Sequence, residues 1–165
     1  MTRNEILVMV PLSDDQAAQL LKDAELSGPL PAVSVNRGLI ETFEIDPKST
    51  DGMAEAELAA LQIAGVYGLR THQRRLIVTA WVAAEQLRLD SQEANGMGEI
   101  TAIAMRQLEA VFVESEPASA ELLGNLQGQD IDAAWELATE FMAVSELLWH
   151  APSELWRLLQ PSSEQ

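Results

Sequence analysis

Two pairs of potential metal ligands lie near the C-terminal end of the sequence. Glu136 precedes Glu140, and Glu146 precedes His150, in each case by four residues, so a helix would place each pair on one face. A protein metal site needs three or four converging ligands with supporting partners, and di-iron bundles space their Glu and His three residues apart. We therefore expect no metal and no other cofactor.

Groups suited to nucleophilic or acid–base catalysis are few. The sequence contains no cysteine, which excludes thiol nucleophiles, thiolate zinc sites and disulfides. Its two histidines, His72 and His150, have no recognisable serine or acid partner. Gly96 and Gly98 begin like a dinucleotide-binding motif, but Thr101 stands at the third glycine position and a strand, not a helix, is expected to follow. These features favour a protein that is not an enzyme.

The main basic cluster consists of Arg70, Arg74 and Arg75, at the end of an expected helix. Guanidinium groups offer forked donors that suit an anion or the carboxylate of a partner protein. The alternative interpretation is structural, because cations in the last turn oppose the helix dipole. In a chain this acidic, some of these arginines can also pair with the chain's own carboxylates.

Charge is strongly negative and unevenly distributed. The net charge is −16; residues 1–83 carry seven Lys/Arg against eleven acids, or −4, and the remainder three against fifteen, or −12. Such a field repels phosphates and anionic membranes and attracts basic protein surfaces. We expect a basic protein partner, with no direct nucleic-acid or membrane binding. There are two alternatives: the acidic surface only keeps the protein soluble, or the protein is an acidic mimic of nucleic acid.

At 165 residues and 18.0 kDa the chain has the size of one domain, which we place at 1–160 with a frayed tail at 161–165. The apolar run Ile6 to Val10 is too short for a signal peptide or a membrane span. The sequence thus predicts a cytoplasmic protein. A homo-oligomer is possible.

The N-terminal third has the pattern of a βαβ unit. Glu5 to Leu12 is an apolar run typical of a buried strand, and Ser13 to Gln16 has the form of a helix capping box. Segment 28–31 (GPLP) is expected to break this helix as a loop, and Ala32 to Val35 is a second strand. Strand, helix and strand within this length predict parallel pairing with a right-handed crossover.

Parallel strands would bring their carboxyl ends to one edge of the sheet, where ligands bind in α/β folds. Ser13 follows the first strand, and Asn36 and Arg37 follow the second. These three polar residues are our candidates for a small-molecule or nucleotide site, which is the main alternative to an interaction module.

The remaining pattern predicts an α/β fold with a mixed sheet of five or six strands, a βαβ start, an antiparallel middle and covering helices. A turn is expected within 92–98. Helices are expected over 36–43, 50–71, 116–127 and from 130, and strands are expected over 74–82, 100–105 and 110–114. The long helix carries a row of small residues, Ala56, Ala60, Ala64 and Gly68, that permits close approach of a neighbour, within the monomer or in a second copy.

The C-terminal stretch SELLWHAPSELWRLL, Ser145 to Leu159, has two interpretations. One helix can run from Ile131 through Trp149, or residues 146–151 can form a short strand, with Pro152 opening a terminal helix. In both, Trp149 most simply packs in the core; the rival hypothesis makes Trp149 and His150 a functional surface motif.

The segments VMVPLSDDQAAQLLKDAEL, AEAELAALQIAGVYGLR, RRLIVTAWV and ELLWHAPSEL together resemble an uncharacterised protein family of actinobacteria. The family pattern closes on Glu-Leu-Leu-Trp-Tyr-Ala, then Gln-Glu, and His150 stands where that pattern has tyrosine. The resemblance implies no activity, and it favours the strand interpretation of residues 146–151.

Overall fold

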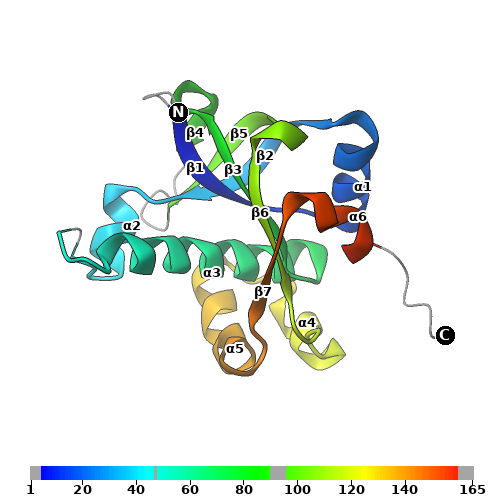
Figure 1. Ribbon diagram of the computed structural model, residues 1–165. Helices are drawn as coiled ribbons and strands as arrows, with labels where there is room; N and C mark the ends of the chain where they lie inside the picture. Colours follow the sequence, from blue (N-terminus) through cyan, green and yellow to red (C-terminus); the bar gives the residue numbers. More distant parts are fainter. Residues whose placement is uncertain (1–4, 47, 90–95, 160–165) are drawn as a thin grey trace.

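The computed structural model describes residues 5–46, 48–89 and 96–159. These residues form one open sheet of seven antiparallel strands, ordered β4-β5-β2-β1-β3-β6-β7, with helices on both faces (Figure 1). The α/β fold and the single sheet are as predicted. The count of five or six strands was too low, because β4 has only three residues and is too short to show a periodic pattern.

The strands are β1 (Glu5–Pro11), β2 (Glu25–Ser34), β3 (Leu76–Ala83), β4 (Leu87–Leu89), β5 (Met97–Ala104), β6 (Leu108–Glu114) and β7 (Leu147–His150). The α-helices are α1 (Asp14–Asp23), α2 (Arg37–Thr42), α3 (Gly52–His72), α4 (Ala120–Leu126), α5 (Ile131–Val144) and α6 (Leu155–Leu158). None of the described helices is long and apolar enough to cross a membrane. The turn predicted within 92–98 and the tail at 161–165 lie partly or wholly outside the described residues.

The predicted parallel βαβ start is wrong. Strand β1 pairs antiparallel with β2, with Val8 opposite Ser34. The segment 28–31, with its two prolines, was expected to be a loop, but it lies inside β2, next to a register shift between Ser27 and Leu30. Only Ala24 lies between the end of α1 and the start of β2, so β2 is longer than the predicted strand and begins directly after the helix.

Each face of the sheet has its own apolar core. Helices α1 and α6 cover one face, and α2, α3, α4 and α5 cover the other. Alternation along β1 divides its side chains between the two cores, with Val8 and Val10 facing α1 and Met9 facing α3. Every strand of the middle of the sheet is thereby buried on both sides, which explains its nearly continuous apolar sequence.

The predicted long helix is confirmed as α3, and its small-residue row packs inside the monomer. Ala56, Ala60, Ala64 and Gly68 are all buried. A methyl group on Gly68 would lie 2.8 Å from the carbonyl oxygen of Arg74, so the helix approaches the start of β3 as closely as a glycine permits.

The C-terminal segment forms a strand, as the family resemblance favours, and the single helix through Trp149 is wrong. Helix α5 ends at Val144 and β7 pairs with β6, placing Trp149 opposite Phe112. The expectation of a core Trp149 is also wrong, because this side chain is 61% exposed. Leu155 of α6 fills the core instead, with no exposed surface.

Candidate functional site

The three residues predicted to form a ligand site do not come together. Since β1 and β2 are antiparallel, Ser13 and Asn36 lie toward opposite ends of the sheet. Their side-chain oxygens accept hydrogen bonds from the first turns of α1 and α2. Arg37 is exposed, and its Nε atom lies 4.0 Å from Glu41 Oε2. Ser13 and Asn36 therefore cap helices, and Arg37 is a surface residue beside Glu41.

The three arginines of the basic cluster bind partners within their own chain. Arg74 Nη1 lies 2.7 Å from Asp14 Oδ1, and Arg70 Nη1 donates to the carbonyl oxygen of Gln129 at 2.9 Å. Arg75 is fully buried. The guanidinium groups diverge rather than forming one anion site, which agrees with the structural interpretation of this cluster.

Arg75 joins the ends of three elements. Its Nε atom donates to Glu114 Oε1 at 3.3 Å, and its Nη2 atom donates to both the carbonyl oxygen and Oγ of Ser145 at 2.8 Å. The guanidinium carbon lies 4.6 Å from the centre of the Phe141 ring. The start of β3, the end of β6 and the end of α5 are thus held together by one side chain.

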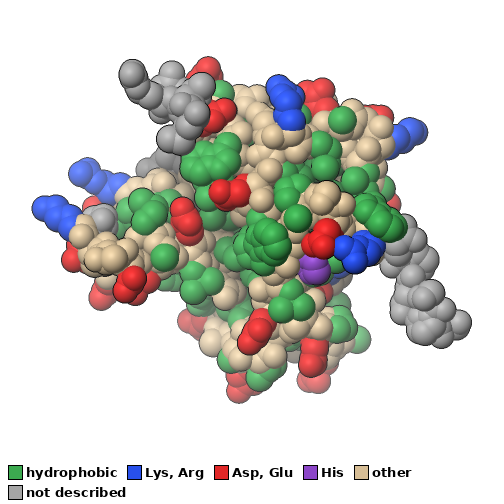
Figure 2. Space-filling model, viewed as in Figure 1, with side chains coloured by type: hydrophobic (Ala, Val, Ile, Leu, Met, Phe, Trp, Pro, Cys, Tyr) green, Lys and Arg blue, Asp and Glu red, His purple; other side chains and the backbone are tan. Residues whose placement is uncertain are grey.

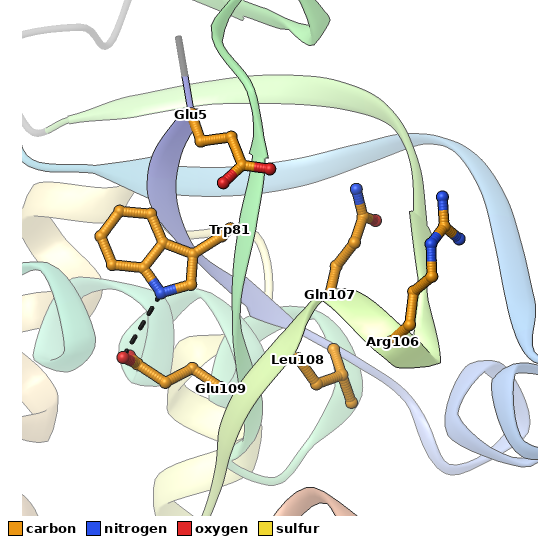
Figure 3. Close-up of a pocket in the computed structure, with 6 residues that line it drawn as sticks. All are labelled: Glu5, Trp81, Arg106, Gln107, Leu108 and Glu109. Atoms are coloured by element: carbon orange, nitrogen blue, oxygen red, sulfur yellow. Dashed lines mark hydrogen bonds between the residues drawn. The ribbon is translucent and has the colours of Figure 1, made fainter. Parts of the chain in front are cut away.

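Two hollows on the α3 face of the sheet meet at Glu109, and we call them together the Glu109 groove. The first has a volume of about 430 Å³. Its walls are Leu7, Met9, Thr79, Ala110, Phe112 and Trp149 from the strands and Glu57, Leu58 and Leu61 from α3, with Glu109 at one side. The second, of about 550 Å³, is lined by Glu5, Trp81, Arg106, Gln107, Leu108 and Glu109 (Figure 3).

A β-bulge directs Glu109 toward this groove. In the pairing of β3 with β6, Thr79 lies opposite Ala110 and Ala80 lies opposite Leu108, so Glu109 is an extra residue without a partner on β3. Bulges of this kind re-aim side chains. Trp81 Nε1 donates a hydrogen bond of 3.4 Å to Glu109 Oε2, drawn as a dashed line in Figure 3.

Two carboxylates in the Glu109 groove oppose each other electrostatically. Partial burial raises the pKa of Glu57 above its usual value of 4.5, and the negative charge of Glu109 raises that pKa further. Within the described ranges, neither Glu57 nor Glu109 forms an ion pair. The groove therefore holds negative charge that the rest of the described chain does not neutralise.

Apolar side chains flank these carboxylates. Leu58 is 56% exposed and Trp149 is 61% exposed. Figure 2 shows hydrophobic side chains gathered over the middle of this view of the molecule, with acidic ones beside them. Arg106 borders the second hollow, but in Figure 3 its side chain extends away from Trp81 and Glu109. A group that is both cationic and partly apolar would match these walls.

The predicted surface motif is split by the alternation of β7. Trp149 lines the Glu109 groove, whereas His150 Nδ1 lies 3.4 Å from Glu154 Oε1. Sequence analysis did not identify Glu57, Trp81 or Glu109. The only signal for Trp81 was an aromatic residue in an aliphatic strand, and the bulge that places Glu109 has no sequence signature.

Within the part of the chain that the structure describes, no group of three or more potential ligands could hold a metal ion. A model of a protein family, described as a family of unknown function (DUF6912), matches residues 6–159. No curated protein and no solved structure matches the chain.

Proposed function

Because the chain belongs to this family of unknown function, we propose a role from the Glu109 groove itself: a non-catalytic interaction module that binds a basic segment of a protein partner. The observation that carries the proposal is the pair Glu57 and Glu109, two carboxylates to which no described residue supplies a counter-ion, beside an exposed tryptophan. A cationic side chain would supply the missing charge.

The chemistry of the walls favours lysine or arginine over a simple metal ion. An ammonium or guanidinium over an indole ring contributes about 0.5–2 kcal/mol, depending on how far it is desolvated. Its aliphatic stem can cover apolar surface such as Leu58 while the charge meets Glu57 and Glu109. A basic segment therefore satisfies both the apolar and the acidic parts of the groove.

The composition of the groove supports binding rather than catalysis. Neither His72 nor His150 lines either hollow. The net charge of −16 would also attract a basic partner over a distance and raise the association rate at low salt. The cytoplasmic location stays a prediction from the sequence.

Affinity capture with matched variants tests the proposal. The tagged wild type, Glu57→Gln/Glu109→Gln and Glu136→Gln/Glu140→Gln are incubated with lysate of the source organism at about 0.05 M and 0.5 M salt, and captured proteins are quantified by mass spectrometry. Glu136 and Glu140 are exposed on α5, so the control removes the same charge from another surface.

We expect the wild type and the control to retain a basic protein at low salt, and the groove variant and high salt to release it. Equal retention by both double variants would contradict the proposal, because bulk charge rather than the groove would then hold the partner. Capture of no basic protein by the wild type would also contradict it.

A second candidate is an enzyme or binder acting on a small organic cation in the same groove. The raised pKa of Glu57, beside a second carboxylate, is the pattern of an acid–base pair. A thermal-shift screen of amines and other metabolites tests it, since a ligand that binds only the folded state raises its melting temperature. The shift should disappear in Glu57→Gln/Glu109→Gln.

A further inference from the structure

The sheet ends at β7 with an open edge. Strand β7 is the last in the strand order and pairs with β6 alone. No other described element pairs with its outer side. An open edge presents backbone donors and acceptors to any strand that can approach it.

The hydrogen-bond pattern shows which backbone groups face outward. Ser115 N donates to Glu146 O at 2.7 Å, and Glu114 N donates to Arg75 O at 3.3 Å. In an antiparallel pair, residues alternate between facing their neighbour and facing away. Glu146 faces β6, so the N–H and C=O groups of Leu147 and Trp149 point to the open side.

Apart from its short length of four residues, the β7 edge lacks the devices that usually protect an edge strand. Its sequence, Leu147-Leu-Trp-His150, has no proline, lysine or acid, and Leu148 and Trp149 are 42% and 61% exposed. The opposite edge, β4, has only three residues, and its Arg88 forms an ion pair with Glu99. The two edges of the sheet are therefore not equivalent.

The β7 edge is continuous with the Glu109 groove. Ile77, Phe112 and Trp149 lie opposite one another across β3, β6 and β7, so their side chains share one face of the sheet. A residue paired with Trp149 on an added strand would place its side chain on this same face, next to the indole ring. Trp149, Glu57 and Glu109 line one hollow, so a long side chain at that position would lie at the Trp149 end of this hollow.

We propose that an extended basic segment of the partner adds to β7 as an eighth, antiparallel strand, like every other strand of the sheet, with Lys or Arg opposite Trp149 and Leu147. This inference rests on the proposed function and specifies how the segment docks. Charge selects this occupant over a second copy of the chain, because two molecules of −16 repel each other and a basic segment is attracted.

Synthetic peptides test the geometry directly. The probe is a peptide of about ten residues that alternates Arg with Val, long enough to cover β7. If the added strand is antiparallel, a residue opposite Trp149 directs both its side chain to the groove face and its N–H to β7. In the proposed alignment such residues are the arginines. Calorimetry at low salt compares the parent peptide with forms N-methylated at Arg or at Val, and with a Glu-Val peptide.

We expect N-methylation at Arg to weaken binding by about tenfold or more, through lost hydrogen bonds and a steric clash, and N-methylation at Val to have little effect. On the protein, Trp149→Pro and Trp149→Thr both remove the indole ring, but only Trp149→Pro also removes the outward N–H. The proline variant should therefore lose the peptide affinity that the threonine variant retains. Circular dichroism and melting curves verify that both variants fold.

The outcomes separate this inference from the proposed function. If both N-methylated peptides bind as well as the parent, the groove binds basic segments without strand pairing, and only the strand addition fails. If the Glu-Val peptide binds equally well, or no basic peptide binds at all, strand addition by a basic segment is refuted. A dimer seen by light scattering and dissociated by Trp149→Pro would make a second copy the occupant and overturn the inference.

Discussion

Glu57 and Glu109 are held close enough to repel each other, on a surface where an apolar or neutral residue would be more stable. The raised pKa of Glu57 reflects first its partial burial and second the charge of Glu109. Binding sites commonly retain such unfavourable groups because removing them would abolish the interaction.

Glu57→Gln should therefore raise the melting temperature at pH 7. A folded-state pKa above the unfolded value means that the folded protein binds the proton more tightly, so ionised Glu57 lowers stability at neutral pH. The advantage of Gln should shrink as the pH falls through the raised pKa of Glu57 and disappear below the usual value of 4.5, where Glu57 is protonated in the folded and the unfolded state. Melting curves across this range, with Glu136→Gln as the control, measure it; a lower melting temperature for Glu57→Gln at pH 7 would contradict the electrostatic description.

Trp149 does not take the core position that its sequence context predicts, whereas the nearby Leu155 is buried. Tryptophan in an apolar segment favours a core position, but strand alternation and the edge position of β7 leave Trp149 61% exposed. Leu155 is buried because Pro152 opens a turn that brings α6 onto the opposite core. Sequence periodicity identified the segment, but not which side chain it buries.

Trp149→Ala should consequently cost less than about 1 kcal/mol of unfolding free energy, as for most exposed positions. Leu155→Ala should cost about 2–5 kcal/mol, because it leaves a cavity in the core beside α1. Urea denaturation of the two variants provides the comparison. A larger loss for Trp149→Ala than for Leu155→Ala would show that the indole ring is structural.

At the level of elements, the strongly apolar segments were predictable and their directions were not. Helix α3 and strands β3 and β6 follow directly from the apolar pattern. The direction of β2 depended on whether segment 28–31 was a loop or part of a strand, and two prolines made a loop the simpler expectation. The end of α5 was not predictable because it involves a contact between segments distant in the sequence: Ser145 Oγ donates to the carbonyl oxygen of Glu116 at 2.7 Å.

A glycine-to-alanine substitution should have opposite effects on stability at Gly68, where α3 packs closely on the sheet, and at Gly124 in α4. Gly68→Ala places a methyl group 2.8 Å from the carbonyl oxygen of Arg74 and should destabilise the protein by about 1–3 kcal/mol. Gly124→Ala in α4 meets no atom within 4 Å and should stabilise it by about 0.5–1 kcal/mol through helix propensity. Chemical denaturation of both variants checks this; a stabilised Gly68→Ala would contradict the close approach.

Across the whole molecule, Arg75 connects parts of the chain that are distant in sequence. Its partners Glu114 and Ser145 belong to β6 and the end of α5. No sequence rule distinguishes a buried arginine from an anion-binding one, so the basic cluster was open to both interpretations. Only the fold shows that Arg75 is fully buried, whereas Arg70 and Arg74 bind their partners closer to the surface.

Arg75→Met should cost about 3–5 kcal/mol of unfolding free energy, because it leaves Glu114 buried without its counter-charge. The double variant Arg75→Met/Glu114→Gln should recover part of this loss, since it removes the unpaired charge. Denaturation midpoints of the wild type and the two variants give the comparison. A double variant less stable than the single one would show that Glu114 does not depend on Arg75.

The proposed function requires that the Glu109 groove, and not the overall acidity, recognises a basic partner. The most direct measurement is the Kd of the captured partner, purified, for the wild type, Glu57→Gln/Glu109→Gln and Glu136→Gln/Glu140→Gln at one low salt concentration. The account predicts a Kd about tenfold or more weaker for the groove variant alone, corresponding to about 1.4 kcal/mol or more. Equal Kd values for the two double variants would contradict it.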